Sequence, residues 1–187
     1  MINRIALVIQ YDGSGFSGWQ NQKNNFITIQ GTIEEKIAEL DPIRPVKVIA
    51  AGRTDSGVHA YGQVAHFDFD TNLTSFELSK AINSNTSRDC KIMSLEQVNS
   101  NFESRFDAVK RKYRYQVYLG SSLLYRNQAW LIDDVDINIL QDLSDMIIGE
   151  YDWAKSFGSS GSDIGADITI SNDGSIFISG WTTGNLN

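Results

Sequence analysis

The stretch Ala51-Gly52-Arg53-Thr54-Asp55-Ser56-Gly57-Val58-His59-Ala60 places an Arg, a Thr and an Asp between two glycines, with a His close behind. Residues 46–50 before it and residues 63–69 after it alternate β-branched or aromatic side chains with other types, a pattern typical of strands. Glycine permits turns that other residues resist, so the sequence predicts a glycine-hinged loop presented between two strands.

The polar residues of this loop allow two interpretations. An Arg next to an Asp favours the ionised carboxylate, so Asp55 and Arg53 could form a reactive pair. Turn glycines and Asp are also common in ordinary loops, and a surface ion pair in a strand connection explains the spacing equally well. The residues of the loop alone leave both interpretations open.

The loop resembles the catalytic loop of the tRNA pseudouridine synthase A family, whose signature is Gly-Arg-Thr-Asp-x-Gly-Val-His. Further blocks resemble the family in the expected order, and together with the loop they cover about residues 3–153. These blocks are residues 9–13 with 16–20, residues 62–67, residues 102–108 and residues 112–115.

The resemblance implies isomerisation of uridine to pseudouridine in the anticodon stem-loop of tRNA, a reaction that requires no cofactor and no metal. It implies that Asp55 is the essential carboxylate, which attacks C1′ of the ribose or C6 of the base, or removes a proton from C2′. Arg53 would pair with Asp55 and help to displace the target nucleotide, and Tyr113 would stack on the displaced uracil.

Composition and charge are compatible with this expectation. The 187-residue chain is moderately apolar, and no apolar run approaches the roughly 20 residues of a membrane helix. No secretory signal is recognisable, and Cys90 is the only cysteine, so we expect a cytoplasmic protein in which Cys90 is a buried strand residue.

The net charge of −7 does not suggest an RNA partner, but the acidic residues are concentrated at one end. Residues 1–118 hold 14 Lys and Arg against 13 Asp and Glu, and residues 119–187 hold 2 against 10. Basic and aromatic residues alternate near residues 105–115, as in surfaces that bind phosphates and stack bases. We expect tRNA as the partner and, from the family, a homodimer. The expected RNA-binding residues are Thr54, His59, Arg105, Phe106, Lys110, Arg111, Lys112 and Arg114.

Some of these residues have a structural alternative. The lysines could simply be solvated, and His59 could shape the loop instead of contacting RNA. His66 is expected to be a sheet residue with its hydrogen bonds satisfied, and Tyr115 is a better candidate than Tyr113 for a core aromatic.

The order of the predicted elements indicates an α+β fold with an antiparallel sheet and helices on one face, built as a split βαβ unit. Strands are predicted at residues 4–11, 46–50, 63–69, 90–98 and 110–119. A helix is predicted after the cap Thr28, another at residues 75–83 with Phe76, Leu78 and Ile82 inward, and a third after the cap Asp136 to residue 148.

The character of the sequence changes near residue 152. Residues 153–187 resemble one unit of a bacterial β-propeller repeat, with a hairpin turn at residues 172–174 between strands at 166–171 and 175–181. We therefore expect a catalytic domain at residues 1–152, a half domain of the synthase family, and a short all-β tail at 153–187, not an independent domain, in place of the family's second half. Two alternatives follow: an inactive, truncated or chimeric RNA-binding remnant, or a fragment of a β-propeller protein.

Overall fold

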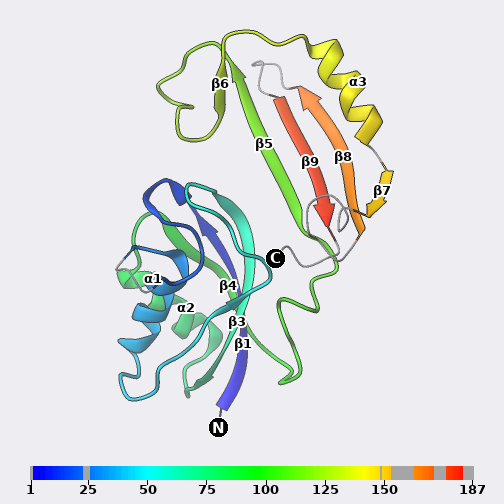
Figure 1. Ribbon diagram of the computed structural model, residues 1–187. Helices are drawn as coiled ribbons and strands as arrows, with labels where there is room; N and C mark the ends of the chain where they lie inside the picture. The colour runs from blue at the N-terminus through cyan, green and yellow to red at the C-terminus, as the bar shows by residue number, and fades with distance from the viewer. Residues whose placement is uncertain (1, 23–25, 148, 153–161, 171–175, 183–187) are drawn as a thin grey trace. The chain divides into compact units, whose positions relative to one another are not determined.

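The computed structural model describes residues 2–22, 26–147, 149–152, 162–170 and 176–182. The chain forms two compact units, Met1–Ala108 and Val109–Asn187 (Figure 1). This division differs from the expected boundary at residues 152 and 153.

Unit 1 contains a four-stranded sheet with the order β2-β3-β1-β4, and every neighbouring pair is antiparallel. Its strands are β1 (Ile2–Tyr11), β2 (Ile49–Ala50), β3 (Ala60–Asp70) and β4 (Cys90–Val98). The alternation in β1 buries Ile5, Leu7, Ile9 and Tyr11 on one face, as predicted. Cys90 is buried in β4, also as predicted, and this burial raises the pKa of its thiol to about 12.

Two helices cover the apolar face of this sheet (Figure 1). Helix α1 (Ile29–Ala38) begins after Thr28, whose side chain accepts a hydrogen bond from the backbone N–H of Gly31 as the predicted cap. Helix α2 (Ser75–Asn85) begins after Thr74. A short 3-10 helix, η1 (Gly13–Gly15), forms the turn that follows β1.

The predicted inward position of Phe76 in α2 is wrong. Leu78 and Ile82 are buried, whereas 77% of Phe76 is exposed. Residues four apart share a helix face, but residues two apart lie about 200° around the axis, so Phe76 faces away when Leu78 faces the core.

Unit 2 contains a five-stranded sheet with the order β6-β5-β9-β8-β7. The strands are β5 (Lys112–Leu119), β6 (Trp130–Ile132), β7 (Gly149–Asp152), β8 (Ser162–Ile170) and β9 (Ile176–Thr182), and only β5 and β6 among the described pairs are parallel. Helix α3 (Ile137–Ile147) follows β6, and the Asp136 side chain accepts hydrogen bonds from the backbone N–H groups of Asn138 and Ile139, as expected of its cap.

The α+β class, the antiparallel sheet and the helices on one face are confirmed in unit 1. The two strands of the expected hairpin also form, as β8 and β9, although its turn at residues 172–174 lies outside the described residues. This hairpin is no separate appendage, because β9 pairs with β5 from Lys112 opposite Trp181 to Val117 opposite Ile176. The segment after residue 152 therefore completes the sheet that contains β5.

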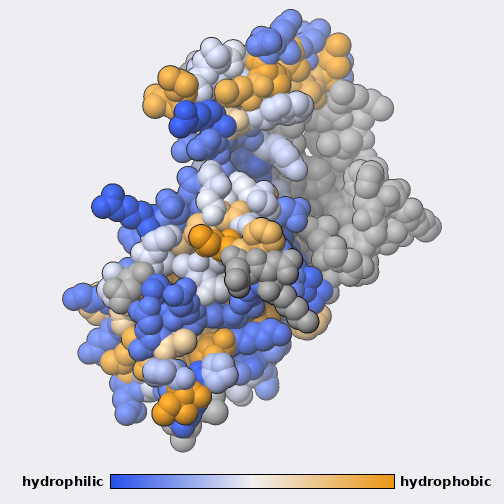
Figure 2. All heavy atoms as spheres, turned by 60° about the vertical axis from the view of Figure 1, so that its left-hand side comes forward, coloured by the Kyte–Doolittle hydropathy of each residue, from blue (hydrophilic) through white to orange (hydrophobic). Residues whose placement is uncertain are grey.

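Large apolar side chains remain exposed in several places. On the face drawn in Figure 2, apolar residues are interspersed with polar ones over the coloured part of the molecule. Among the described residues, no helix is both long and apolar enough to cross a membrane.

Candidate active site

The loop between β2 and β3 presents Asp55 to solvent at a tight turn. The backbone N–H of Val58 donates to the carbonyl oxygen of Asp55 over 3.2 Å, and Gly57 has a φ of +81°. A positive φ at the third position is the requirement of a type II turn, which glycine meets without strain. The side chain of Asp55 is exposed, as a group that must reach an external substrate has to be.

The turn that follows β1 holds the first half of this loop. The backbone N–H of Trp19 donates to the carbonyl oxygen of Thr54 over 2.9 Å, and the hydroxyls of Tyr11 and Thr54 are hydrogen-bonded at 2.8 Å. The hydroxyl of Ser56 donates to the carbonyl oxygen of Phe16 over 3.1 Å. Thr54, an expected RNA-binding residue, therefore anchors the loop through both its carbonyl and its hydroxyl.

The second half of the loop meets the same turn at His59. Its Nδ1 lies 3.2 Å from the backbone nitrogen of Gly13 and 3.0 Å from Oδ1 of Asp12. A side chain at Gly13 would collide with the carbonyl of Val58, so this close approach requires glycine. Hydrogen bonds from Ser14, assisted by the charge of His59, lower the pKa of the Asp12 carboxyl.

Arg53 and Asp55 are both exposed, and the expected pairing between them is absent: no ion pair or hydrogen bond joins them among the described residues. Their side chains occupy alternate positions along the loop. The backbone beside Arg53 is nevertheless fixed, because the side-chain amide of Gln63 donates to the carbonyl oxygen of Gly52 over 2.6 Å.

Arg105 and Phe106 lie near the end of unit 1. The guanidinium carbon of Arg105 is 5.8 Å from the ring centre of Phe106, and 70% of Phe106 is exposed. The preceding Ser104 is buried and donates from its hydroxyl to the carbonyl oxygen of Ile49 over 2.8 Å. The pair is therefore displayed next to a fixed point of the chain, an arrangement suited to stacking on a base.

The other expected site residues belong to unit 2. Tyr113 is partly buried on β5, opposite Gly180 of β9, and Lys110, Arg111, Lys112 and Arg114 precede or surround it. Tyr115 was the better candidate for a core aromatic, and this is wrong, since 72% of its surface is exposed. The expected residues thus fall into three groups: the Asp55 loop, the Arg105–Phe106 pair, and the start of β5.

Tyr11 and Asp12 contact the loop and Ser56 lies within it, and none of the three had an expected role. Residues 9–13 were identified only as a block that resembles the family, because a contact across more than 40 residues cannot be deduced from local spacing. A turn of Asp and Gly directly after a strand was the one available signal.

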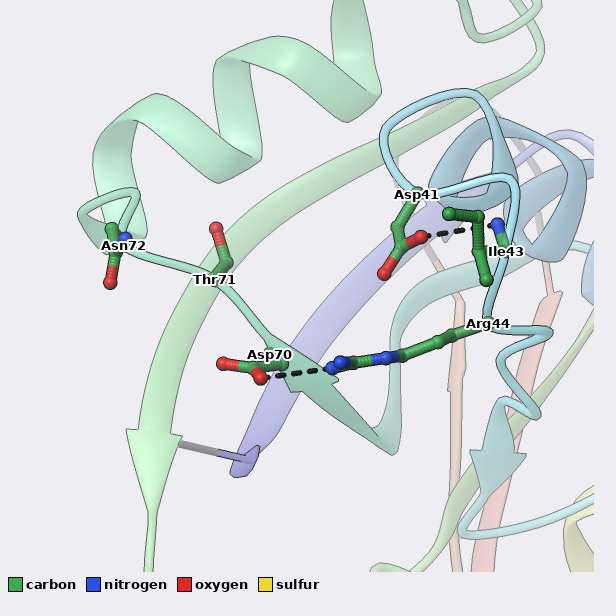
Figure 3. Close-up of a pocket in the computed structure, with 6 residues that line it drawn as sticks. All are labelled: Asp41, Ile43, Arg44, Asp70, Thr71 and Asn72. Atoms are coloured by element: carbon green, nitrogen blue, oxygen red, sulfur yellow. Dashed lines mark hydrogen bonds and ion pairs between the residues drawn. The ribbon is translucent and has the colours of Figure 1, made fainter.

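A surface pocket also lies in unit 1, and none of the residues of these three groups lines it (Figure 3). It is formed by the segments 41–44 and 70–72. An ion pair joins the two segments, with Nη1 of Arg44 2.9 Å from Oδ2 of Asp70. Its lining residues are Asp41, Ile43, Arg44, Asp70, Thr71 and Asn72. Among the described residues, no group of three or more His, Cys, Asp or Glu side chains could hold a metal ion.

Comparison with known proteins places the Asp55 loop in a family. A family model described as tRNA pseudouridine synthase matches residues 7–107. The tRNA pseudouridine synthase A of Maridesulfovibrio salexigens is 36% identical over 170 residues, which cover 89% of this chain and 62% of that protein. Its counterpart in Prochlorococcus marinus subsp. pastoris is 38% identical over 180 residues, covering 92% of this chain and 65% of that protein.

Two facts follow from these coverages. The chain spans about three fifths of the length of the curated relatives it matches. A match to 92% of the chain also leaves fewer residues unmatched than the segment 153–187 contains, so the similarity continues past the point near residue 152 where a departure from the family was expected. With its Asp55 loop, its antiparallel sheet and these relatives, the chain belongs to the tRNA pseudouridine synthase family.

Proposed function

We propose that this chain isomerises uridine to pseudouridine in the anticodon stem-loop of tRNA, with Asp55 as the essential carboxylate. The observation that carries the proposal is the exposed Asp55 on a loop anchored at both ends, within the region that matches the synthase family. The relatives are named for action on tRNA, and this supports tRNA as the partner.

The reaction conserves all atoms and needs no electron donor or acceptor. The bond between C1′ and N1 breaks, the uracil turns, C5 bonds to C1′, the hydrogen on C5 is lost to solvent, and N1 gains a hydrogen. One carboxylate can start this sequence by attacking C1′ or C6, or by removing a proton from C2′. A glycoside hydrolase ordinarily needs a second carboxylate at about 5–9.5 Å, so a loop in which Asp55 is the only acidic residue fits isomerisation better.

The other residues have roles that fit their surroundings. Tyr113 stacks on the displaced uracil, and Arg53 contacts the RNA backbone as the nucleotide leaves its stack, a step that costs a few kcal/mol. Arg105 with Phe106 and the cations before and within β5 bind phosphates and bases. The homodimer expected from the family is part of this proposal, and sedimentation of the purified chain tests it.

The alternative of an inactive RNA-binding remnant is separated from an enzyme by measuring binding and turnover on the same tRNA. Binding without turnover would support the remnant. The alternative of a β-propeller fragment has less support, because β9 pairs with β5 and the synthase relatives match most of the chain.

The first prediction tests the proposal at its centre. Asp55→Asn keeps the shape of the side chain and removes its charge, so pseudouridine formation should fall by at least about 10³-fold while tRNA affinity stays within about threefold. Single-turnover assays on an unmodified tRNA measure the rate, and filter binding measures the affinity. Asp133→Asn changes an exposed acid of unit 2 and should retain wild-type turnover. Retained turnover in Asp55→Asn would refute the assignment.

A further inference from the structure

We propose that Asp12 is a positioning residue for the Asp55 loop, and that its carboxylate acts by accepting a hydrogen bond from Nδ1–H of His59. The inference rests on the proposed function only where turnover is the measurement. It concerns the residue that directly follows β1 and contacts the loop at His59.

Asp12 is fixed before it meets the histidine. Its Oδ1 accepts a hydrogen bond from the backbone N–H of Ser14 over 2.9 Å, and its own backbone N–H donates to the carbonyl oxygen of Asp89 over 2.8 Å. The backbone of Asp12 is thus bound to the residue before β4, and its carboxylate is bound to the turn that follows β1. A carboxylate that is itself held in place can fix the side chain that donates to it. A positioning residue has to meet this requirement.

His59 Nδ1 has two partners that it cannot satisfy at once. It lies 3.0 Å from Oδ1 of Asp12 and 3.2 Å from the backbone nitrogen of Gly13. With a proton, Nδ1 donates to Asp12. Without one, it accepts from the N–H of Gly13, and its lone pair then faces the Asp12 carboxylate, which is an unfavourable electrostatic contact. The negative charge of Asp12 therefore selects the form of His59 that carries its proton on Nδ1.

This choice affects Asp55 because the loop is held from both sides. Thr54 is tied to Tyr11 and Trp19 before the turn, and His59 is tied to Asp12 after it. Without the Asp12 carboxylate, the side after the turn keeps only the hydrogen bond from the backbone N–H of Gly13 to Nδ1 of His59 and the pairing of Ala60 with Tyr11, so the loop is held less firmly there. Displacement of a reacting group by about 1 Å can reduce a rate by about 10²-fold, so the second hold has a large effect on turnover.

The test compares the full chain with Asp12→Asn, Asp12→Ala and a matched control, Asp41→Asn. Asp41 also accepts a hydrogen bond from the backbone N–H two residues ahead, that of Ile43 over 3.1 Å, but it lines the pocket of Figure 3 and not the loop. The chain has 2 His, so nitrogen-15 spectra of the side chains are simple, and His66→Gln assigns them.

At a pH at which the imidazoles are neutral, we expect the proton of His59 on Nδ1 in the wild type and in Asp41→Asn. We expect it on Nε2 in Asp12→Asn. Amide hydrogen exchange at Val58, whose backbone N–H donates to the carbonyl oxygen of Asp55, should accelerate by about fivefold or more in Asp12→Asn and in Asp12→Ala. A wild type with the proton on Nε2, or unchanged exchange in both Asp12 variants, would overturn the proposal.

Turnover supplies a separate readout. For Asp12→Asn, kcat should fall by about tenfold while KM for tRNA stays within about threefold, because the loop moves but Arg105, Phe106 and the cations before and within β5 do not. A raised KM with unchanged kcat would overturn the proposal by making Asp12 an RNA contact. If the wild-type chain shows no turnover, the proposed function fails, and the spectra and exchange rates still decide the role of Asp12. If Asp12→Ala does not fold, Asp12→Asn alone decides.

Discussion

His66 is a buried titratable group in a position that costs stability at low pH. It is on the sheet face opposite α1 and α2, since alternation along β3 places Phe67 toward the core. Its side chain is 1% exposed, its Nδ1 lies 2.9 Å from the hydroxyl of Ser104, and its Nε2 is the one buried side-chain polar atom without a hydrogen bond among the described residues. Glu103 Oε2 is 3.5 Å from Nε2, too far for a good hydrogen bond.

This burial predicts a specific dependence of stability on pH. Desolvation lowers the pKa of His66, opposed by the charge of Glu103, with Arg4, Asp68 and Asp107 as the other charged neighbours. A lowered pKa means that the unfolded chain binds the proton more tightly than the folded protein does. The contribution of neutral His66 to the free energy of unfolding is therefore retained above about pH 6.5 and is lost as the pH falls below it.

The variant His66→Gln removes this titration. The free energy of unfolding of the wild type minus that of His66→Gln should be constant above about pH 7.5. It should decrease as the pH is lowered from about 6.5 to 5, because only the wild type loses stability through protonation of His66. Urea unfolding at each pH measures the difference. Parallel curves for the two proteins over the whole range would show that the burial of His66 has no such effect.

Individual residues were predictable where the signal was local. Alternation identified the buried side chains of β1, and the cap Thr28 followed from its position before an apolar period. The contact of Asp12 with His59 was not predictable, because it depends on the turn after β1 and the loop before β3 meeting in the fold. The loop signature thus identified Asp55, and only the structure identified what holds it.

At the scale of elements, the strength of the local pattern decided the outcome. The strand expected at residues 46–50 is reduced to Ile49–Ala50, because the backbone N–H of Val48 donates to the side chain of Glu34 over 2.9 Å and leaves the strand pattern. Strand β6 has three residues and was not predicted, since so short a run shows no periodicity.

Helix α2 shows how a cap stabilises an element. The hydroxyl of Thr74 accepts a hydrogen bond from the backbone N–H of Glu77, and the Glu77 carboxylate accepts one from the backbone N–H of Thr74 over 2.9 Å. Hydrogen bonds from the backbone N–H and the hydroxyl of Thr74 lower the pKa of the Glu77 carboxyl. The reciprocal backbone bonds satisfy donors that the first turn of a helix leaves open.

Thr74→Ala should therefore reduce the free energy of unfolding by about 0.5–2 kcal/mol. Phe76→Ala, in the same helix turn, should change it by less than about 0.5 kcal/mol, because Phe76 is largely exposed. Urea unfolding followed by circular dichroism compares the two. A larger loss in Phe76→Ala than in Thr74→Ala would mean that Phe76 contributes to the core after all.

At the scale of the whole molecule, the acidic end of the chain and the basic start of β5 belong to one unit. Residues 119–187 carry 10 Asp and Glu against 2 Lys and Arg, yet β8 and β9 from this part complete the sheet that begins at Lys112. The composition change near residue 152 suggested that residues 153–187 do not belong to the fold of the preceding residues. The composition of a strand does not reveal with which other strand it will pair. The overall negative charge therefore does not exclude a local basic surface.

That local surface provides the last prediction. Replacing Lys110, Arg111 and Lys112 together by Ala should weaken tRNA binding and make it less sensitive to salt. The slope of log affinity against log salt should fall by about 0.7 to 0.9 for every phosphate that the variant no longer neutralises, because fewer counterions are released on binding. The control replaces three exposed cations of unit 1, Lys47, Lys80 and Arg88, which makes the same change in net charge. Binding titrations between 50 and 300 mM salt, roughly the range in which such slopes are linear, measure both variants. If the two variants lower the slope equally, the effect comes from net charge and the start of β5 is no RNA surface. A decrease confined to the first variant, with the turnover of bound tRNA retained, assigns these residues to binding and leaves the chemistry to the loop of Asp55.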